Sequence, residues 1–199
     1  FFIKTDGSVW AMGKNWYGQL GDGTTDPRHS PVQVMDGGVV SVAAGPNHAL
    51  FLKEDGSVWA SGQNSYYGQL GDGTMQNQHS PIKVVDSEVV SVAVGNDHSQ
   101  IVKADGSLWS VGSNEFGQLG DGTLENRTTW TKVMDGGVHG VTASGASVFV
   151  FAEPNQAPTD LTLSNNPILE NQPAGTIVGE LNATDPDVFL GLQSFAYAF

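Results

Sequence analysis

One heptapeptide, Gly-Gln-Leu-Gly-Asp-Gly-Thr, constrains the fold more than any other feature, because the chain repeats it three times. The copies occupy residues 18–24, 68–74 and 117–123, so they lie 50 and 49 residues apart. A period of this length is typical of propellers and solenoids, in which one supersecondary unit packs against its own kind. Three glycines allow a tight turn with positive φ, and the leucine supplies an apolar anchor. We interpret the heptapeptide as a packed turn.

Two predicted strands open each repeat. Alternating apolar segments lie at 1–4, 50–53 and 100–103, and segments with a tryptophan follow at 8–11, 57–60 and 107–110. Asp-Gly stands between them each time, at residues 6–7, 55–56 and 105–106. Because both central residues of a type I′ turn need positive φ, this dipeptide predicts a type I′ hairpin. No helical period appears anywhere in the chain.

Two further strands are predicted after each heptapeptide. A variable insert comes first, at residues 25–30, 75–80 and 124–129, and a third strand starts at Pro31, Pro81 and Trp130. A fourth strand is predicted at 39–44, 89–94 and 138–143. Four short antiparallel strands in about 50 residues describe one propeller blade. The predicted fold class is therefore all-β, with about three four-stranded blades.

The repeats resemble those of the regulator of chromosome condensation family. The resemblance depends on Asp-Gly-Ser-Val-Trp-Ala-x-Gly, Asn-x-x-Gly-Gln-Leu-Gly, a Ser-Pro strand and Ala-x-Gly-x-x-His, and it covers residues 1–151. It implies a β-propeller, usually of seven blades, of which this chain holds a part. In the founding member the resemblance implies nucleotide exchange on a small GTPase and chromatin binding. Secreted bacterial relatives use the scaffold as a binding platform, in one case to inhibit β-lactamases.

A second module is expected after a proline-bearing linker at residues 152–157. Residues 158–199 resemble the start of a cadherin-like repeat, which implies the first part of an immunoglobulin-like β-sandwich. The resemblance assigns Glu170, Asp185 and Asp187 to calcium. In that family the glutamate and the Asp-x-Asp pair serve two different sites, so neither site is complete in this chain. The alternative is that Asp-Pro-Asp is an ordinary turn.

The charge of the chain limits its partners. Eight Lys and Arg against 21 Asp and Glu give a net charge of −13, which disfavours nucleic acid and anionic membranes and suits calcium or cationic partners. There is no cysteine, so disulfides and thiolate metal sites are excluded. This composition suits a secreted or surface-displayed bacterial protein. No apolar run reaches the ~20 residues of a membrane-spanning helix.

The polar residues that recur are interpreted as scaffold. His48 and His98 recur in register, and Ser147 takes their place in the third copy, which favours a hydrogen-bonded packing role. The aspartates of the heptapeptide are interpreted as turn formers, because the other donors of a calcium loop are missing. A catalytic group is normally unique, whereas these residues are triplicated. We therefore expect no catalytic site and no enzyme.

Specificity is expected in the positions that differ between the copies. The variable inserts should emerge on one face of the ring, with Trp16, Tyr66 and Trp130 as aromatic anchors. The alternative is that the inserts are merely solvated loops. The candidate binding residues are Trp16, Asp26, Arg28, Tyr66, Gln78, Glu125, Arg127 and Trp130.

The sequence alone favours a non-catalytic adhesion protein outside the cell or on its surface. The propeller would bind a protein or cell-surface partner, and the cadherin-like module would make adhesion depend on calcium. One alternative is an accessory propeller of a secreted enzyme or inhibitor. Another is an intracellular nucleotide-exchange factor for a small GTPase, which the negative charge disfavours.

Overall fold

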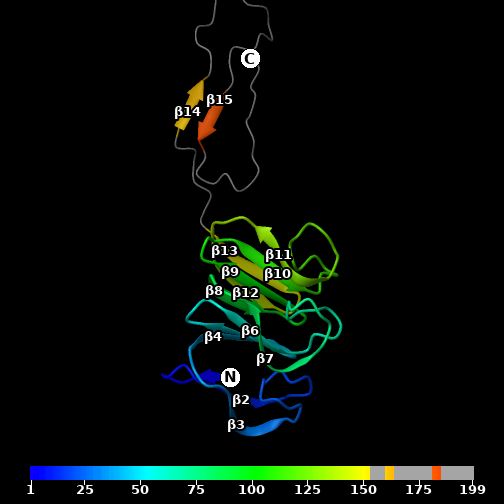
Figure 1. Ribbon diagram of the computed structural model, residues 1–199. Coiled ribbons are helices and arrows are strands. Elements are labelled where there is room, and N and C mark those ends of the chain that lie inside the picture. The colour runs from blue at the N-terminus through cyan, green and yellow to red at the C-terminus, as the bar shows by residue number, and fades with distance from the viewer. Residues whose placement is uncertain (153–159, 164–180, 185–199) are drawn as a thin grey trace, which may run out of the picture. The chain divides into compact units, whose positions relative to one another are not determined.

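The computed structural model describes residues 1–152, 160–163 and 181–184, and this part of the chain is all-β. The chain divides into two compact units, Phe1–Ala152 and Glu153–Phe199. The strands of the first unit (Figure 1) are β1 (Phe2–Ile3), β2 (Val9–Gly13), β3 (Arg28–Met35), β4 (Val39–Ala44), β5 (His48–Lys53), β6 (Val58–Gly62), β7 (Gln78–Val85), β8 (Val89–Val94), β9 (His98–Lys103), β10 (Leu108–Gly112), β11 (Arg127–Met134), β12 (Val138–Ser144) and β13 (Ser147–Ala152).

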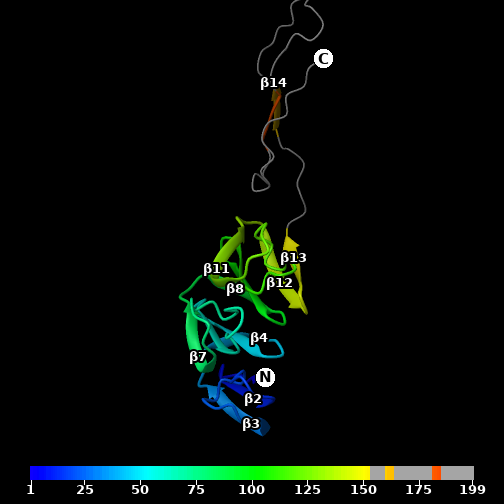
Figure 2. The same cartoon turned by 90° about the vertical axis from the view of Figure 1, so that its right-hand side faces the viewer.

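These strands form antiparallel sheets that follow one another along the first unit (Figure 2). The first sheet has the order β1-β2-β3. The second and third have four strands each, β4-β5-β6-β7 and β8-β9-β10-β11, and the fourth is the pair β12-β13. Two complete four-stranded sheets with partial sheets on either side are consistent with a partial β-propeller.

The sheets are offset from the sequence repeats. The strand at Val39–Ala44, which we predicted as the last strand of the first repeat, pairs with β5 of the next repeat through Val42↔Phe51 and Ala43↔Leu50. The strand at Val89–Val94 pairs in the same way with β9. Each complete sheet thus combines the fourth strand of one repeat with the first three strands of the following repeat. This exchange joins consecutive repeats through main-chain hydrogen bonds.

The hairpin turns are one residue longer than the type I′ turn that Asp-Gly predicted. Gly7 has a φ of 75°, but Asp6 is not among the residues with positive φ. The Gly7 amide donates to the carbonyl of Lys4 (2.9 Å), and the Lys4 amide donates to Ser8 (2.9 Å). These bonds are those of a turn over residues 4–7 followed by a glycine bulge. The carboxylate of Asp6 accepts from the Ser8 amide (2.9 Å), which fixes the turn.

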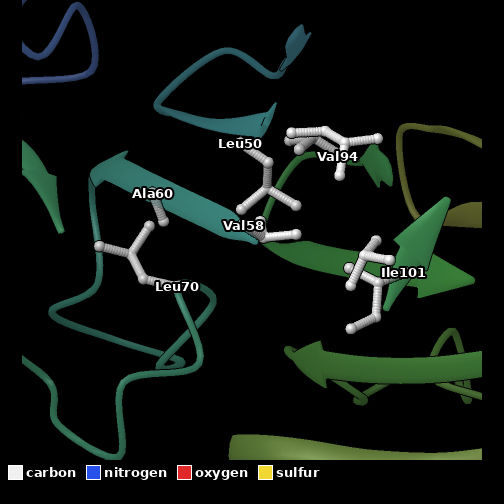
Figure 3. Close-up of a cluster of buried hydrophobic side chains, with 8 residues drawn as sticks. Leu50, Val58, Ala60, Leu70, Val94 and Ile101 are labelled. Carbon is white, nitrogen blue, oxygen red and sulfur yellow. The ribbon is translucent and has the colours of Figure 1, made fainter. Parts of the chain in front are cut away.

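The hydrophobic core lies between neighbouring sheets, so the inner strands are apolar on both sides. In β5, Ala49 and Phe51 face the first sheet. They cluster with Val39 of the neighbouring β4 and with Val9 of β2 in the first sheet. Leu50 packs on the other side, in a cluster shared with the third sheet (Figure 3). The members of that cluster are Leu50, Leu52, Val58, Ala60, Leu70, Val89, Val94 and Ile101. A further cluster joins the third and fourth sheets.

Two strands of the second unit are described, β14 (Asp160–Leu163) and β15 (Leu181–Thr184), which pair antiparallel. The predicted immunoglobulin-like sandwich over residues 158–199 is not shown by this pair. The predicted calcium ligands Glu170, Asp185 and Asp187 lie outside the described residues.

Candidate protein-binding face

The heptapeptide forms a turn built around a buried asparagine. Asn15 donates through Nδ2 to the Asp22 carboxylate (3.0 Å) and accepts through Oδ1 from the Leu20 amide (2.9 Å). Asp22 also accepts from the amide of Thr24 (3.1 Å). The second and third turns repeat these bonds with Asn64 and Asp72 and with Asn114 and Asp121. The interpretation of these aspartates as turn formers is confirmed.

A side chain from the following strand completes each turn. Arg28 forms an ion pair with Asp22, and Arg127 pairs with Asp121 at 2.8 Å. In the second turn Gln78 donates to Asp72 (3.3 Å). Burial raises the pKa of Asp121, but the Thr123 hydrogen bonds and the Arg127 guanidinium outweigh it, so that this pKa falls to about 2. The Asp121 carboxylate is therefore ionised, and the carboxylates of all three turns have hydrogen-bond partners within their own repeat.

The first two turns pack on the last strand of the next sheet, β7 and β11 respectively. A Cβ added at Gly18 would lie 2.6 Å from the Cα of His79, and one at Gly68 would lie 2.7 Å from the Cα of Thr128. The Gly23 amide donates to the His79 carbonyl (2.9 Å), and the Gly73 amide donates to Thr128 (3.0 Å). Only glycine permits so close an approach of two backbones.

The recurring histidines are buried inside the sheets. His48 lies 2.9 Å from Ser99 Oγ, and Ser99 donates to the carbonyl of Gln69 (2.8 Å), so His48 Nε2 carries the proton and donates to Ser99. Desolvation, followed by the influence of His98, lowers the pKa of His48 to about 3. The predicted hydrogen-bonded packing role is confirmed for His48. His98 has no such partner among the described residues, because Val148 stands where Ser99 stands in the previous sheet.

The loops between the second and third strands present aromatic side chains to solvent. They cover residues 14–27, 63–77 and 113–126 and lie on the same side of the first unit in Figure 1. Trp16 is 67% exposed, Tyr66 66% and Phe116 78%. Lys14 lies over the Trp16 ring at 5.0 Å from its centroid. Exposed aromatic side chains of this kind are frequent anchors in protein interfaces.

The predicted binding residues fall into two groups. Trp16, Asp26, Tyr66 and Glu125 lie exposed in these loops. The others lie within strands and contact their own blade or its neighbour: Arg28, Gln78 and Arg127 contact the aspartates, and Trp130 packs beside Gly71 and the cluster around Leu70.

Sequence reasoning missed Phe116 as a candidate anchor. It occupies the aromatic position directly before the heptapeptide, where Tyr17 and Tyr67 are only partly exposed. The signal was available, because a phenylalanine replaces tyrosine there. We name the three loops with Trp16, Tyr66 and Phe116 the loop face.

Two carboxylates, Asp97 and Glu115, lie beside the third of these loops. Partial burial, and then the charge of Glu115, raise the pKa of Asp97 above its ordinary value. The Asp97 carbonyl accepts from the Ser113 amide (2.8 Å), which holds this turn against the third loop. These two carboxylates beside the third loop favour a partner with positive charge there.

Neither a metal cluster nor a membrane-crossing helix is found in the described part of the chain. There, no group of three or more His, Asp and Glu side chains is placed to hold an ion. No helix in the same part is long and apolar enough to span a bilayer.

Comparison with protein families identifies the class. The model of the regulator of chromosome condensation (RCC1) repeat matches residues 6–52, 55–102 and 105–150, and a second model of the same repeat matches 39–69 and 89–118. The matches cover well over half of the sequence. The chain therefore belongs to the RCC1 repeat family. No match was found among curated protein sequences.

Solved structures of RCC1-like proteins share the fold. Prp20p of Saccharomyces cerevisiae, described for its binding to Gsp1p and histones, is 22% identical with a TM-score of 0.64, over 72% of this chain and 39% of its own. Human WBSCR16 is 30% identical, with a TM-score of 0.60, over 75% and 43%. Yeast RCC1 (Prp20) bound to Kap60 is 25% identical, with a TM-score of 0.60, over 72% and 37%. The chain thus spans about two fifths of these relatives.

These comparisons overturn the predicted function. Extracellular calcium-dependent adhesion is wrong, because the matching structures are RCC1-like proteins and none of the comparisons supports a cadherin-like repeat. The error came from reading the charge and the segment after residue 152 as signs of a surface protein. The negative charge that disfavours nucleic acid does not disfavour a basic protein.

Proposed function

We propose that this chain is part of a protein-binding propeller with an exchange-factor-like role, and that the loop face contacts the protein partner. The observation that carries the proposal is the position of Trp16, Tyr66 and Phe116. They are exposed in loops on one side of a scaffold whose recurring turn aspartates are occupied internally. Rigid sheets with variable loops are a common arrangement for recognition.

The similar structures support a protein partner. Prp20p binds Gsp1p and histones, and yeast RCC1 (Prp20) is seen bound to Kap60. A chain with a net charge of −13 attracts basic proteins such as histones, since opposite charge speeds encounter and fixes orientation. The family resemblance implies a small GTPase as the partner for nucleotide exchange. In both roles the chain would act through binding and would need no covalent chemistry of its own.

The experiment titrates the full chain with core histones and, separately, with a small GTPase, by biolayer interferometry. Release of fluorescent GDP from the GTPase is followed in parallel. The test variant combines Trp16→Ala, Tyr66→Ala and Phe116→Ala. The matched control is Val40→Ser with Val90→Ser, because these valines are also exposed but lie in strands β4 and β8.

We expect the wild-type chain to bind at least one of these proteins, and the triple variant to bind it at least tenfold more weakly, as for aromatic anchors. The control should bind as the wild type does. Faster GDP release would support the exchange-factor role, and histone binding alone would support the binding role without it. Equal loss in both variants, or no loss in the triple variant, would contradict the use of the loop face.

A further inference from the structure

A pocket of about 290 Å³ lies between the second and third sheets, beside the turn that joins them. That turn, residues 86–88, leads from β7 to β8, and the residues that line the pocket lie between Val84 and Trp130. Both sheets have four strands, so consecutive repeats form its walls. Strand β7 begins at the loop face with Gln78 and ends at Val85 beside the pocket. The pocket is therefore a surface separate from the loop face.

The walls of this pocket are aliphatic and aromatic. Val84, Val85 and Ile101 supply aliphatic side chains, and the half-buried Trp109 and Trp130 supply indole rings. Pockets for drug-sized ligands start at about 300 Å³, so this space suits one long side chain of a partner better than a larger molecule.

Two of these walls differ from the corresponding positions between the first and second sheets. Ile101 of β9 has the register of Phe51 in β5, which is buried against the first sheet. Trp130 of β11 has the register of Pro81 in β7. The smaller isoleucine leaves space beside the turn, and the indole ring adds a second aromatic wall.

A strained glutamate lies at the mouth of the pocket. Glu88 has a φ of 70°, and no other residue except glycine has a positive φ in the part of the chain that the structure describes. The other two repeats have Gly38 and Gly137 at this position, with φ of 71° and 74°. A side chain in this conformation lowers stability, and glycine would avoid the cost. Strain that is kept at one position indicates a use for the side chain.

The charges around the pocket favour a cation. Asp86 and Glu88 line it with exposed carboxylates, against the single ammonium group of Lys103. Lys103 Nζ lies 3.8 Å from Glu88, at the outer limit of an ion pair, and Lys83 lies 3.5 Å from Asp86. Exposed pairs of this kind are weak, so both carboxylates can accept from a further cation. A guanidinium group can both stack on an indole ring and donate to a carboxylate.

We infer that this pocket binds an arginine side chain of a basic protein partner. Lys103 lies over the Trp109 ring at 5.1 Å from its centroid, so the guanidinium stacks on the other indole ring, that of Trp130. Its N–H groups donate to the Glu88 carboxylate, and its aliphatic stem contacts Ile101. The positive charge of the partner comes from the proposed function, on which this site rests, and the pocket adds a second contact surface.

The experiment follows the indole N–H signals of the isotope-labelled full chain by NMR during titration with the blocked tripeptide Gly-Arg-Gly. Gly-Leu-Gly and Gly-Glu-Gly are the comparison peptides. Ile101→Phe fills the pocket with the residue that the neighbouring junction uses. Glu88→Gln removes the charge and keeps a side chain at positive φ, whereas Glu88→Gly removes both. Asp36→Asn, in the corresponding turn between the first and second sheets, is the matched control.

We expect Gly-Arg-Gly to shift the signals of Trp109 and Trp130 saturably in the wild type and the control, and to leave the signal of Trp59 unchanged. Ile101→Phe should abolish the shifts, and Glu88→Gln should weaken binding about tenfold, as for the loss of a hydrogen bond to a charged group. Glu88→Gly should bind as weakly as Glu88→Gln and melt about 2 °C higher than the wild type, because the strain is removed. A glutamate retained only for the fold would give a lower melting temperature instead.

The absence of any shift at millimolar peptide, equal shifts with Gly-Leu-Gly, or unchanged binding by Glu88→Gln would overturn the inference. Because the tripeptide reports on this pocket alone, each of these results is independent of the titrations of the loop face with histones and the GTPase. The triple variant of the loop face should keep the tripeptide shifts, which would show that the two surfaces are separate.

Discussion

At the turns and inside the sheets, the hydrogen bonds of single residues depend on the protonation states of those residues. The buried His48 donates to Ser99, which in turn donates to a main-chain carbonyl, so this chain of hydrogen bonds requires a neutral imidazole. The carboxylate of Asp121 accepts from Thr123 and Arg127, so that turn requires an ionised acid. Sequence repetition predicted both roles. That His98 lacks a hydrogen-bond partner among the described residues was not predicted, because it depends on Val148 in the weaker third repeat.

The stability of the chain should fall as the pH drops below 6.5. The pKa of His48 is lowered to about 3, whereas the unfolded chain binds a proton near 6.5, so protons stabilise the unfolded state. The loss is at most about 1.4 kcal/mol per pH unit for this residue. Thermal melting of the wild type and of His48→Gln between pH 7.5 and 4.5 tests it. The variant should show a shallower slope, and parallel slopes would contradict the account.

Removing the charge of Asp121 should weaken the third turn at neutral pH. Asp121→Asn loses the ion pair with Arg127, and we expect the free energy of unfolding to fall by about 1 kcal/mol. Since the pKa of Asp121 is lowered, its contribution is present above pH 4 and is lost as the pH falls toward 2. Urea unfolding at pH 7 and pH 3 measures this. The exposed Asp26→Asn is the matched control and should change stability little at either pH.

At the scale of elements, the sequence predicted the strands well and their grouping poorly. Alternating apolar residues and Asp-Gly turns predicted the hairpins. The sequence pattern could not show whether Val39–Ala44 pairs with the strand before it or with the strand after it, because both neighbouring segments are predicted strands. The third strand starts at Arg28, three residues before Pro31, since a polar side chain that contacts the turn aspartate looks like a loop residue in sequence.

Equivalent glycines of two heptapeptides should respond differently to the same substitution. Gly68→Asn places a Cβ 2.7 Å from the backbone of Thr128, so the turn must separate from β11, at a cost of about 1–3 kcal/mol. Gly117 has a similar φ, but the Cβ of Asn there would meet only the flexible end of the Leu124 side chain. Urea unfolding at low protein concentration compares the two. Similar losses in both variants would mean that φ alone, and not the contact with the next sheet, requires glycine.

For the whole molecule, the sequence predicted a repeat array and a family but not the partner. The family follows from short motifs that recur in register, whereas the loop face depends on residues such as Phe116 that vary between copies. The negative charge was read as a sign of calcium. Net charge constrains the sign of a partner and says nothing of its identity.

That negative charge should make the chain less stable at low salt. With a net charge of −13, repulsion between carboxylates destabilises the chain more than its ion pairs stabilise it. Three of those ion pairs are exposed or join residues close in sequence, so they contribute little. Added NaCl screens charges beyond about 10 Å, so the melting temperature should rise as NaCl increases toward about 0.2 M. Asp97→Asn tests this destabilisation at a single carboxylate, because burial and Glu115 raise the pKa of Asp97 and disfavour its ionised form. This variant should melt higher than the wild type at pH 7, and the gain should shrink as the pH falls, because the raised pKa lets the wild-type carboxyl bind a proton at a higher pH than an ordinary aspartate does. A melting temperature that falls with salt would show that the ion pairs of the turns, and not the excess of carboxylates, dominate the electrostatics of the propeller.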